Sequence, residues 1–211
     1  MSNFKIARGF ITSSESNQIL NWIDSIDHVG SDANYHLSEL SKDLKGKSCI
    51  FDISDTPLTN YITKFQSISD VSKEKVPDFI YSIIDRISGE FGFPKDHIFL
   101  QAVDMNRGGK INPHYDASID GYISYKCNIS VLSEDYELFL DKDVIEIKET
   151  DLYGFEASLY KHWTNEFKSR RVLLSFGFIL PYDVLDRKEN DARIRLSKRI
   201  EKYFQKSIET T

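Results

Sequence analysis

The chain has 211 residues, of which 27 are Lys or Arg and 33 are Asp or Glu, so its formal net charge is −6. Aromatic residues make up 13% of it, which excludes a wholly disordered chain. No apolar run approaches the roughly 20 residues that a membrane-spanning helix needs. The acidic balance disfavours binding to nucleic acid or to an anionic membrane. With two cysteines and no secretory signal, we expect reduced thiols and a cytoplasmic location.

The first 96 residues are predicted to form a mainly helical support with short strands. Apolar residues at helical spacing predict three helices, over about 15–26, 57–65 and 76–91. Gly92 is expected to end the last of them, because glycine readily adopts the left-handed conformation that closes a helix. Short strands are expected at 4–10 and 47–54.

After residue 97 the hydrophobic pattern changes to a period of two, which is typical of β-strands. Strands are expected at 98–105, 111–116, 122–132, 136–141, 144–148, 152–163 and 170–180. No helical segment separates them, so an antiparallel sandwich or barrel is favoured. A basic amphipathic helix is expected from about 186 to 206. The sequence therefore predicts one domain, 1–211, with a strand-rich core at 97–182 and a helical tail at 183–211.

A histidine and an aspartate lie two residues apart, at His114 and Asp116. In an extended segment such residues point to the same side, so they present an imidazole and a carboxylate to a common point. An imidazole from a distant strand completes the two-His-one-carboxylate triad of non-haem iron(II). His162 is the remaining histidine in a predicted strand. A surface turn with two solvated side chains is the alternative interpretation.

The last predicted strand carries an arginine near its start. Alternation places Arg171 and Ser175 on the interior face and Arg170 on the apolar outer face. An interior arginine needs an anionic partner, because an unpaired buried charge is costly. No strand carboxylate is an obvious partner, so we expect a dicarboxylate ligand that pairs with the guanidinium through two hydrogen bonds. An edge-strand arginine that reaches solvent is the alternative.

The order of these motifs resembles that of the iron(II)/2-oxoglutarate-dependent oxygenases, and within them the prolyl-hydroxylase-like branch. The resemblance spans about residues 98–181 and rests on the segments LQAVDMNRGGKINPHYD, YELFLD, YGFEASLYKHW and RRVLLSFGF. It implies an α+β fold with a double-stranded β-helix (jelly-roll) core. N-terminal helices are then expected to pack on one sheet, and a C-terminal helix is expected to follow the core.

The same resemblance implies a reaction and the residues that carry it. Fe(II) is the implied metal, and 2-oxoglutarate and O₂ are the implied co-substrates. The iron ligands are expected to be His114, Asp116 and His162, and Arg171 with Ser175 is expected to bind 2-oxoglutarate. The implied oxidoreductase is a dioxygenase of the hydroxylase type, which releases succinate and CO₂. The carboxylate at position 116 argues against the halogenases of the family, which typically lack this ligand.

One position departs from the pattern of the branch. A tyrosine near the co-substrate often stands late in the first core strand, where this chain has Met105. Tyr125 is a candidate replacement for co-substrate binding, because we expect Tyr125, Cys127 and Ile129 to face the interior from the next long strand. A purely structural place in the core is the alternative for Tyr125.

The segment 117–122 directly follows the expected ligands and is a candidate lid over the substrate. Within it, Ser118, Asp120 and Tyr122 are the candidate substrate contacts, and Asp120 is expected to pair with a substrate amine. An ordinary hairpin loop is the alternative interpretation.

Chain length and charge limit the class of substrate. A short acidic chain favours a small molecule such as an amino acid or metabolite, with an aminoacyl residue of a peptide second. Nucleic acid and membrane are not expected as partners, and the oligomeric state is left open. Two other functions stay open, namely demethylation of nucleic acid or protein within the same superfamily, and a non-catalytic jelly-roll binding module.

Overall fold

The computed structural model describes residues 4–26, 46–53, 76–116, 122–134 and 136–181. Its elements are β1 (Lys5–Ala7), α1 (Ser13–Ser25), β2 (Gly46–Asp52), α4 (Asp78–Phe91), β3 (Ile98–Met105), β4 (Tyr122–Leu132), β5 (Tyr136–Leu140), β6 (Asp143–Ile147), β7 (Leu152–Glu156), β8 (His162–Thr164) and β9 (Arg171–Pro181). The strands form a six-stranded sheet, in the order β1-β7-β4-β9-β3-β2, and a three-stranded sheet, in the order β6-β5-β8. All strand pairs are antiparallel.

The helices α1 and α4 lie where helical periodicity predicts them. Thr12 caps α1 by accepting a hydrogen bond from the backbone of Glu15, whose side chain accepts one from the backbone of Thr12 in return. The helix α4 ends at Gly92, which adopts the predicted left-handed conformation with φ of 71°. Two other predicted helices, at 57–65 and 186–206, fall outside the described residues. Within the described residues no helix is long and apolar enough to cross a membrane.

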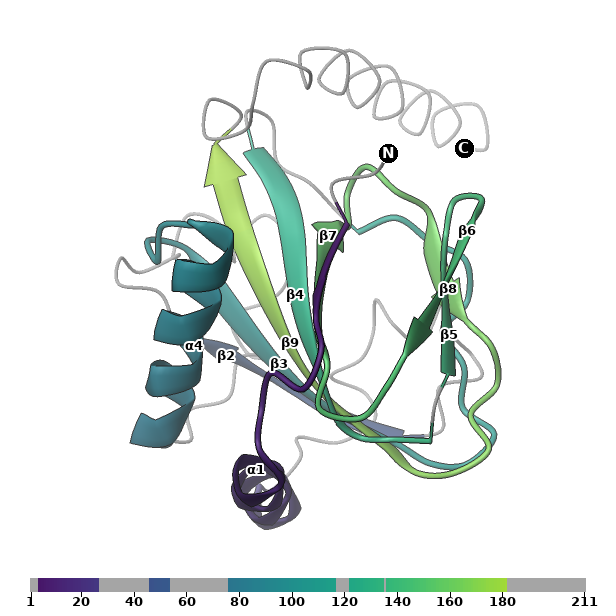
Figure 1. Ribbon diagram of the computed structural model, residues 1–211, viewed down its shortest axis with the longest axis horizontal. Coiled ribbons are helices and arrows are strands. Elements are labelled where there is room, and N and C mark those ends of the chain that lie inside the picture. The colour runs from purple at the N-terminus through teal and green to yellow at the C-terminus, as the bar shows by residue number, and fades with distance from the viewer. Residues whose placement is uncertain (1–3, 27–45, 54–75, 117–121, 135, 182–211) are drawn as a thin grey trace, which may run out of the picture.

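One face of the six-stranded sheet packs against the helices, and the three-stranded sheet lies on the other side (Figure 1). The strand β9 shows the two faces most clearly. Four of its side chains join the helices in the larger hydrophobic core, namely Val172, Leu174, Phe176 and Phe178. Between them, Leu173 packs in a second, smaller core. The predicted alternation of this strand is therefore confirmed.

The strand β4 shows the opposite orientation to the one that we expected. Tyr125, Cys127 and Ile129 belong to the core under the helices, and the Tyr125 ring lies 4.7 Å from that of Phe93, centre to centre. The expectation that these three side chains face the interior is therefore wrong, because the assignment of faces along β4 is shifted by one residue. Both faces of β4 are buried, so burial alone cannot assign them; the apolar set packs under the helices, where no polar group is needed.

The first 96 residues contribute to the large sheet as well as to its cover. The strand β1 forms one edge by pairing with β7, and β2 forms the other by pairing with β3. Gly154 on β7 allows the end of α4 to come close, because a Cβ there would lie 2.7 Å from the ring of Phe91. The support and the strand-rich core thus share one sheet.

Two predicted strands differ from the observed elements. The segment 111–116 contains no strand, only an isolated bridge between His114 and His162. The predicted strand at 152–163 is broken by a turn, so that β7 lies in the large sheet and β8 in the small one. Because of this break, His162 lies in the small sheet, while the first part of the predicted strand lies in the large one.

Candidate metal centre

Three potential metal ligands lie together between the sheets. His114, Asp116 and His162 each offer one ligand atom, and these atoms all lie within 4.8 Å of one another. Oδ1 of Asp116 is 3.3 Å from Nε2 of His114 and 3.6 Å from Nε2 of His162. The side chains are between 7% and 15% exposed, so the group is largely shielded but still reachable.

Backbone hydrogen bonds bring the three residues together across the chain. His114 and His162 exchange a reciprocal pair, with the amide of each donating to the carbonyl of the other at 3.1 and 2.9 Å. The amide of Asp116 donates to the carbonyl of Ala157 at 3.0 Å. The segment that carries the His-x-Asp motif is therefore held against β8 and the turn before it, although it forms no regular strand.

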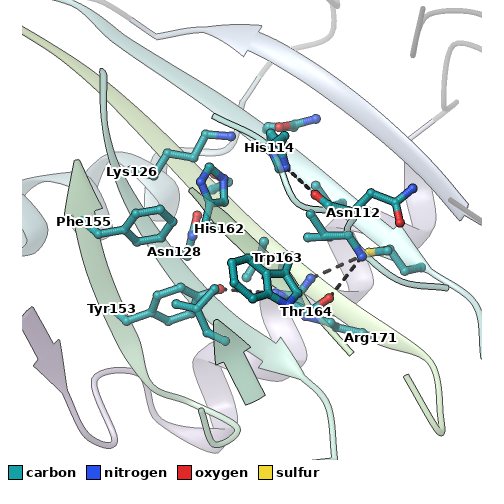
Figure 2. Close-up of a pocket in the computed structure, with 17 residues that line it drawn as sticks. Asn112, His114, Lys126, Asn128, Tyr153, Phe155, His162, Trp163, Thr164 and Arg171 are labelled. Atoms are coloured by element: carbon teal, nitrogen blue, oxygen red, sulfur yellow. Dashed lines mark hydrogen bonds between the residues drawn. The ribbon is translucent and has the colours of Figure 1, made fainter. Parts of the chain in front are cut away.

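Both imidazoles are oriented in the same way. Nδ1 of His114 lies 2.8 Å from the carbonyl oxygen of Asn112 (Figure 2), and Nδ1 of His162 lies 3.1 Å from that of Tyr160. A carbonyl oxygen can only accept, so each Nδ1 carries a proton, and in the neutral imidazole the lone pair is then on Nε2. The two Nε2 atoms are the ones that approach Asp116, which is the arrangement that a metal ligand needs.

The charge states of these groups suit metal binding. Burial opposes ionisation of Asp116, but the nearby Lys126 ammonium holds the pKa of the carboxyl well below its usual range. Burial lowers the pKa of His162 to about 4, and the nearby Asp116 carboxylate only partly opposes this. At neutral pH Asp116 is therefore ionised and His162 neutral, which are the states that bind a metal.

Arg171 lies at the other end of the same cavity, which also reaches His114 and His162 (Figure 2). Its side chain is 1% exposed, and its guanidinium lies 4.4 Å from the ring centre of Tyr136 and 4.7 Å from that of Phe167. Nη2 donates to the hydroxyls of Tyr136 at 2.8 Å and Tyr153 at 3.3 Å.

The charge of Arg171 has no acidic partner within the described part of the chain. Besides the two tyrosines, its Nη1 contacts Sδ of Met105 at 3.7 Å, and its Nε is buried without a hydrogen-bond partner. Burial opposes the charge, but the Tyr136 and Tyr153 hydroxyls raise the pKa of Arg171 above its ordinary value. The guanidinium therefore stays protonated and can still pair with an anion.

A row of polar residues forms the floor of the cavity. Gln101 on β3, Ser175 on β9, Asn128 on β4 and Tyr153 on β7 are neighbours in register, and all four line the cavity. Oγ of Ser175 and Oδ1 of Asn128 are buried and have no hydrogen-bond partner among the residues that the structure describes. Unsatisfied buried groups are rare in folded proteins, so these two atoms mark a place for a polar ligand.

The other predicted site residues have different positions. Tyr125 lies under the helices, on the side of the sheet away from the cavity, so its expected place beside the co-substrate is a wrong prediction. Arg170 points away from Arg171 and pairs with Asp104 and Asp24. Ser118 and Asp120 fall outside the described residues. Tyr122 is the first residue of β4 and is partly buried.

Sequence reasoning missed the cavity-lining side chains of β4 and β7. Lys126, Asn128 and Tyr153 all face the cavity, and so does Trp163 beside His162. The alternation of β4 did carry a signal, because its second set of side chains is polar, with Ser124, Lys126, Asn128 and Ser130. A polar set in a strand buried on both faces indicates a ligand cavity.

The donor sets fit the groups that the sequence suggests. Two imidazole nitrogens and one carboxylate oxygen, converging from one side, are the ligands of non-haem Fe(II) sites with open coordination positions. A buried guanidinium with an unused Nε, together with the unsatisfied Ser175 hydroxyl, which can donate, suits a polar anion such as a dicarboxylate. The residues present therefore fit both a metal and an anionic ligand in one cavity.

No family model and no curated protein matches the sequence. Solved structures do match in fold, at low sequence identity, and some of them contain bound 2-oxoglutarate. A viral collagen prolyl hydroxylase from Paramecium bursaria Chlorella virus-1, in its 2-oxoglutarate complex, has a TM-score of 0.53 at 13% identity, over 84% of this chain and 96% of that one.

Two further structures agree with it. A Pseudomonas putida prolyl-4-hydroxylase has a TM-score of 0.53 at 11% identity, covering 84% of this chain and 93% of its own. HygX from Streptomyces hygroscopicus, with nickel and 2-oxoglutarate bound, has a TM-score of 0.56 at 9% identity, covering 86% and 84%. The chain therefore shares the fold of these two prolyl hydroxylases and of HygX.

Proposed function

We propose that the chain is an Fe(II)/2-oxoglutarate-dependent oxygenase that hydroxylates a C–H bond. The substrate is an amino acid or another small metabolite, or an aminoacyl residue, and succinate and CO₂ are the co-products. We also propose that the two sheets together form the double-stranded β-helix of this enzyme class. The single observation that carries the proposal is that one cavity joins His114 and His162 to the buried Arg171, which has no acidic partner among the described residues.

The metal end of the cavity supports the first half of the proposal. His114 and His162 direct Nε2 toward Oδ1 of Asp116, and backbone carbonyls fix both rings. Three protein ligands leave coordination positions for other groups. Bound Fe(II), with 2-oxoglutarate and O₂, supplies the oxidising chemistry that converts the keto acid to succinate and CO₂ and hydroxylates the substrate.

The arginine end supports the second half. Arg171 binds the far carboxylate of 2-oxoglutarate, and the Tyr136 and Phe167 rings keep its guanidinium in place. Along β9, Ser175 lies between Arg171 and Gly177, and Gly177 is the register partner of Lys126 on β4. The Ser175 hydroxyl can then donate to an oxygen of the co-substrate, which gives this unsatisfied atom a partner.

The proposed substrates follow from size, charge and the structural neighbours. Two neighbours are prolyl hydroxylases, which supports an aminoacyl residue as substrate. The net charge of −6 disfavours a nucleic acid. The segment 117–122, proposed from the sequence as a lid, directly follows Asp116 in the sequence.

A turnover screen tests the proposal. The purified chain is incubated with Fe(II), ascorbate, 2-oxoglutarate and air, and with amino acids, short peptides or methylated oligonucleotides. We expect one class of amino acid or peptide to stimulate succinate release and to gain the mass of one oxygen atom. The variant His114→Ala, which removes one expected iron ligand, should give neither signal.

Two outcomes contradict the proposal in different ways. Demethylation of an oligonucleotide, with no response to any amino acid or peptide, would keep the enzyme class but replace the substrate. A chain that binds neither Fe(II) nor 2-oxoglutarate would instead be a non-catalytic binding module. Metal content and 2-oxoglutarate binding are therefore measured on the same preparation.

A further inference from the structure

The two oxygens of the Asp116 carboxylate have different surroundings. Oδ1 faces the two imidazoles, at 3.3 Å from Nε2 of His114 and 3.6 Å from Nε2 of His162. Oδ2 is 2.9 Å from Nζ of Lys126. One oxygen is therefore directed to the place where a metal would bind, and the other is already taken by a cation of the protein.

Lys126 is placed for this contact by the β-sheet. It lies on the cavity face of β4, between Gly177 of β9 and Phe155 of β7 in register. Its side chain is 25% exposed, so its ammonium is partly desolvated and its charge is only partly screened. It is the one lysine among the described cavity-lining residues.

A carboxylate without such a partner has two free oxygens and can bind a metal with both. Two-oxygen binding would occupy one more coordination position. The proposed reaction needs those positions, because 2-oxoglutarate and O₂ must both reach the metal. The same carboxylate held through Oδ2 can offer only Oδ1, and the three open positions remain.

We propose that Lys126 is a positioning residue that holds Oδ2 of Asp116, so that the carboxylate presents only Oδ1 to the metal. This inference rests on the proposed function, because it assigns a role within the same metal centre. Lys126 contacts neither metal nor co-substrate in this role; it acts through Asp116, as residues behind metal ligands commonly do.

The test compares three variants of the full chain. Lys126→Met removes the ammonium but keeps the length of the side chain, and Lys126→Arg keeps a cation at the same position. Lys148→Met is the matched control, since Lys148 is exposed and directly follows β6. Thermal unfolding of each variant shows whether it is folded.

Three readouts are taken from the folded variants. They are the stoichiometry of Co(II) binding, the visible absorption of the Co(II) protein, and the Kd of 2-oxoglutarate for the metal-loaded protein without O₂. We expect Lys126→Met to bind one Co(II), to show a changed visible absorption because one open position passes from solvent to the carboxylate, and to bind 2-oxoglutarate roughly 10- to 100-fold more weakly. Lys126→Arg and Lys148→Met should both resemble the wild type.

The contrary outcomes are distinct. A Lys126→Met variant with the Co(II) spectrum and 2-oxoglutarate Kd of the wild type overturns the inference and leaves the proposed function intact. A folded Lys126→Met variant that binds no metal also overturns it, because Lys126 would then be required for more than the binding mode of Asp116. Wild-type protein that binds neither Co(II) nor 2-oxoglutarate overturns the proposed function itself.

Discussion

The two faces of the six-stranded sheet differ in the polarity of their buried side chains. The face under α1 and α4 is mainly apolar, with side chains such as Leu174 and Phe176 at 0% exposure. The face toward the small sheet carries a buried arginine, a lysine and a row of polar residues, and several of their atoms have no partner. Adjacent residues of one strand, such as Leu174 and Ser175, thus belong to different environments.

This difference separates stability from function along each strand. Burial of apolar area on the helix-covered face stabilises the fold, whereas unsatisfied polar groups on the cavity face cost stability unless a ligand completes them. The unsatisfied groups of the cavity face therefore indicate that a polar ligand binds there. Substitutions on the two faces should accordingly change different measured quantities.

The largest expected effect is at the metal end of the cavity face. His162→Ala should abolish metal binding and turnover, because two ligands cannot replace the three-ligand group. His97→Ala is the matched control, since His97 lies just before β3 and outside the group. Metal content after dialysis and succinate release are the measurements. Full metal stoichiometry in His162→Ala would show that another residue is the third ligand.

The next effect separates two adjacent arginines. Arg171→Met should raise the Kd of 2-oxoglutarate by more than about tenfold, because the loss of one partner of a buried charge pair costs roughly 2–5 kcal/mol. Arg170→Met should leave this Kd unchanged, since Arg170 pairs with Asp104 and Asp24. Calorimetric titration of the metal-loaded variants measures both. The reverse result would mean that the cavity lies on the other face of β9.

Neighbouring residues of β9 give the most direct contrast between the faces. Leu174→Ala should lower the free energy of unfolding by about 2–5 kcal/mol, as large-to-small substitutions in a core do. It should not change 2-oxoglutarate binding. Denaturant unfolding and ligand titration of the same preparations measure the two quantities.

Ser175→Ala should show the opposite pattern. Its Oγ has no hydrogen-bond partner in the described part of the chain, so its removal should leave the free energy of unfolding unchanged or slightly higher. The Kd of 2-oxoglutarate should rise by several-fold, in line with a lost hydrogen bond of about 0.5–1.5 kcal/mol. Equal loss of stability in both variants would contradict the distinction between the faces.

The smallest effect concerns the reactivity of a thiol on the helix-covered face. Burial raises the pKa of Cys127 well above its ordinary value, and its side chain is 0% exposed. Its thiolate fraction therefore stays low as the pH rises from 7 to 9, and alkylation of the folded protein should be slow. Peptide mapping after iodoacetamide treatment measures it; rapid modification at Cys127 would place it at an accessible surface.

Sequence patterns predicted the helix-covered face better than the cavity face. The apolar set of β9 and the isoleucines of α4 gave clear periodicities, and both were found as expected. The strand β4 gave two competing sets, because both of its faces are buried, and the choice made for Tyr125 was wrong. Periodicity identifies two faces of a strand, but it does not identify which one meets the helices.

The sequence predicted those site residues that belong to a short motif. It did not predict those that come together only because distant strands lie side by side. The His-x-Asp spacing led to His114 and Asp116, and the structure brings His162 to them from β8. Tyr136 and Tyr153 approach Arg171 from β5 and β7, and no local pattern relates these positions. Lys126 likewise meets Asp116 only through the register of the sheet.

The central claim is that one cavity binds Fe(II) and 2-oxoglutarate together. Titration of the metal-free chain with Fe(II) and 2-oxoglutarate under anaerobic conditions tests it most directly. The account predicts a weak visible charge-transfer band that requires both components, saturates at one Fe(II) per chain and is lost in Arg171→Met at the same concentrations. A mixture that stays colourless at saturating concentrations, with no iron retained by the protein, would contradict it.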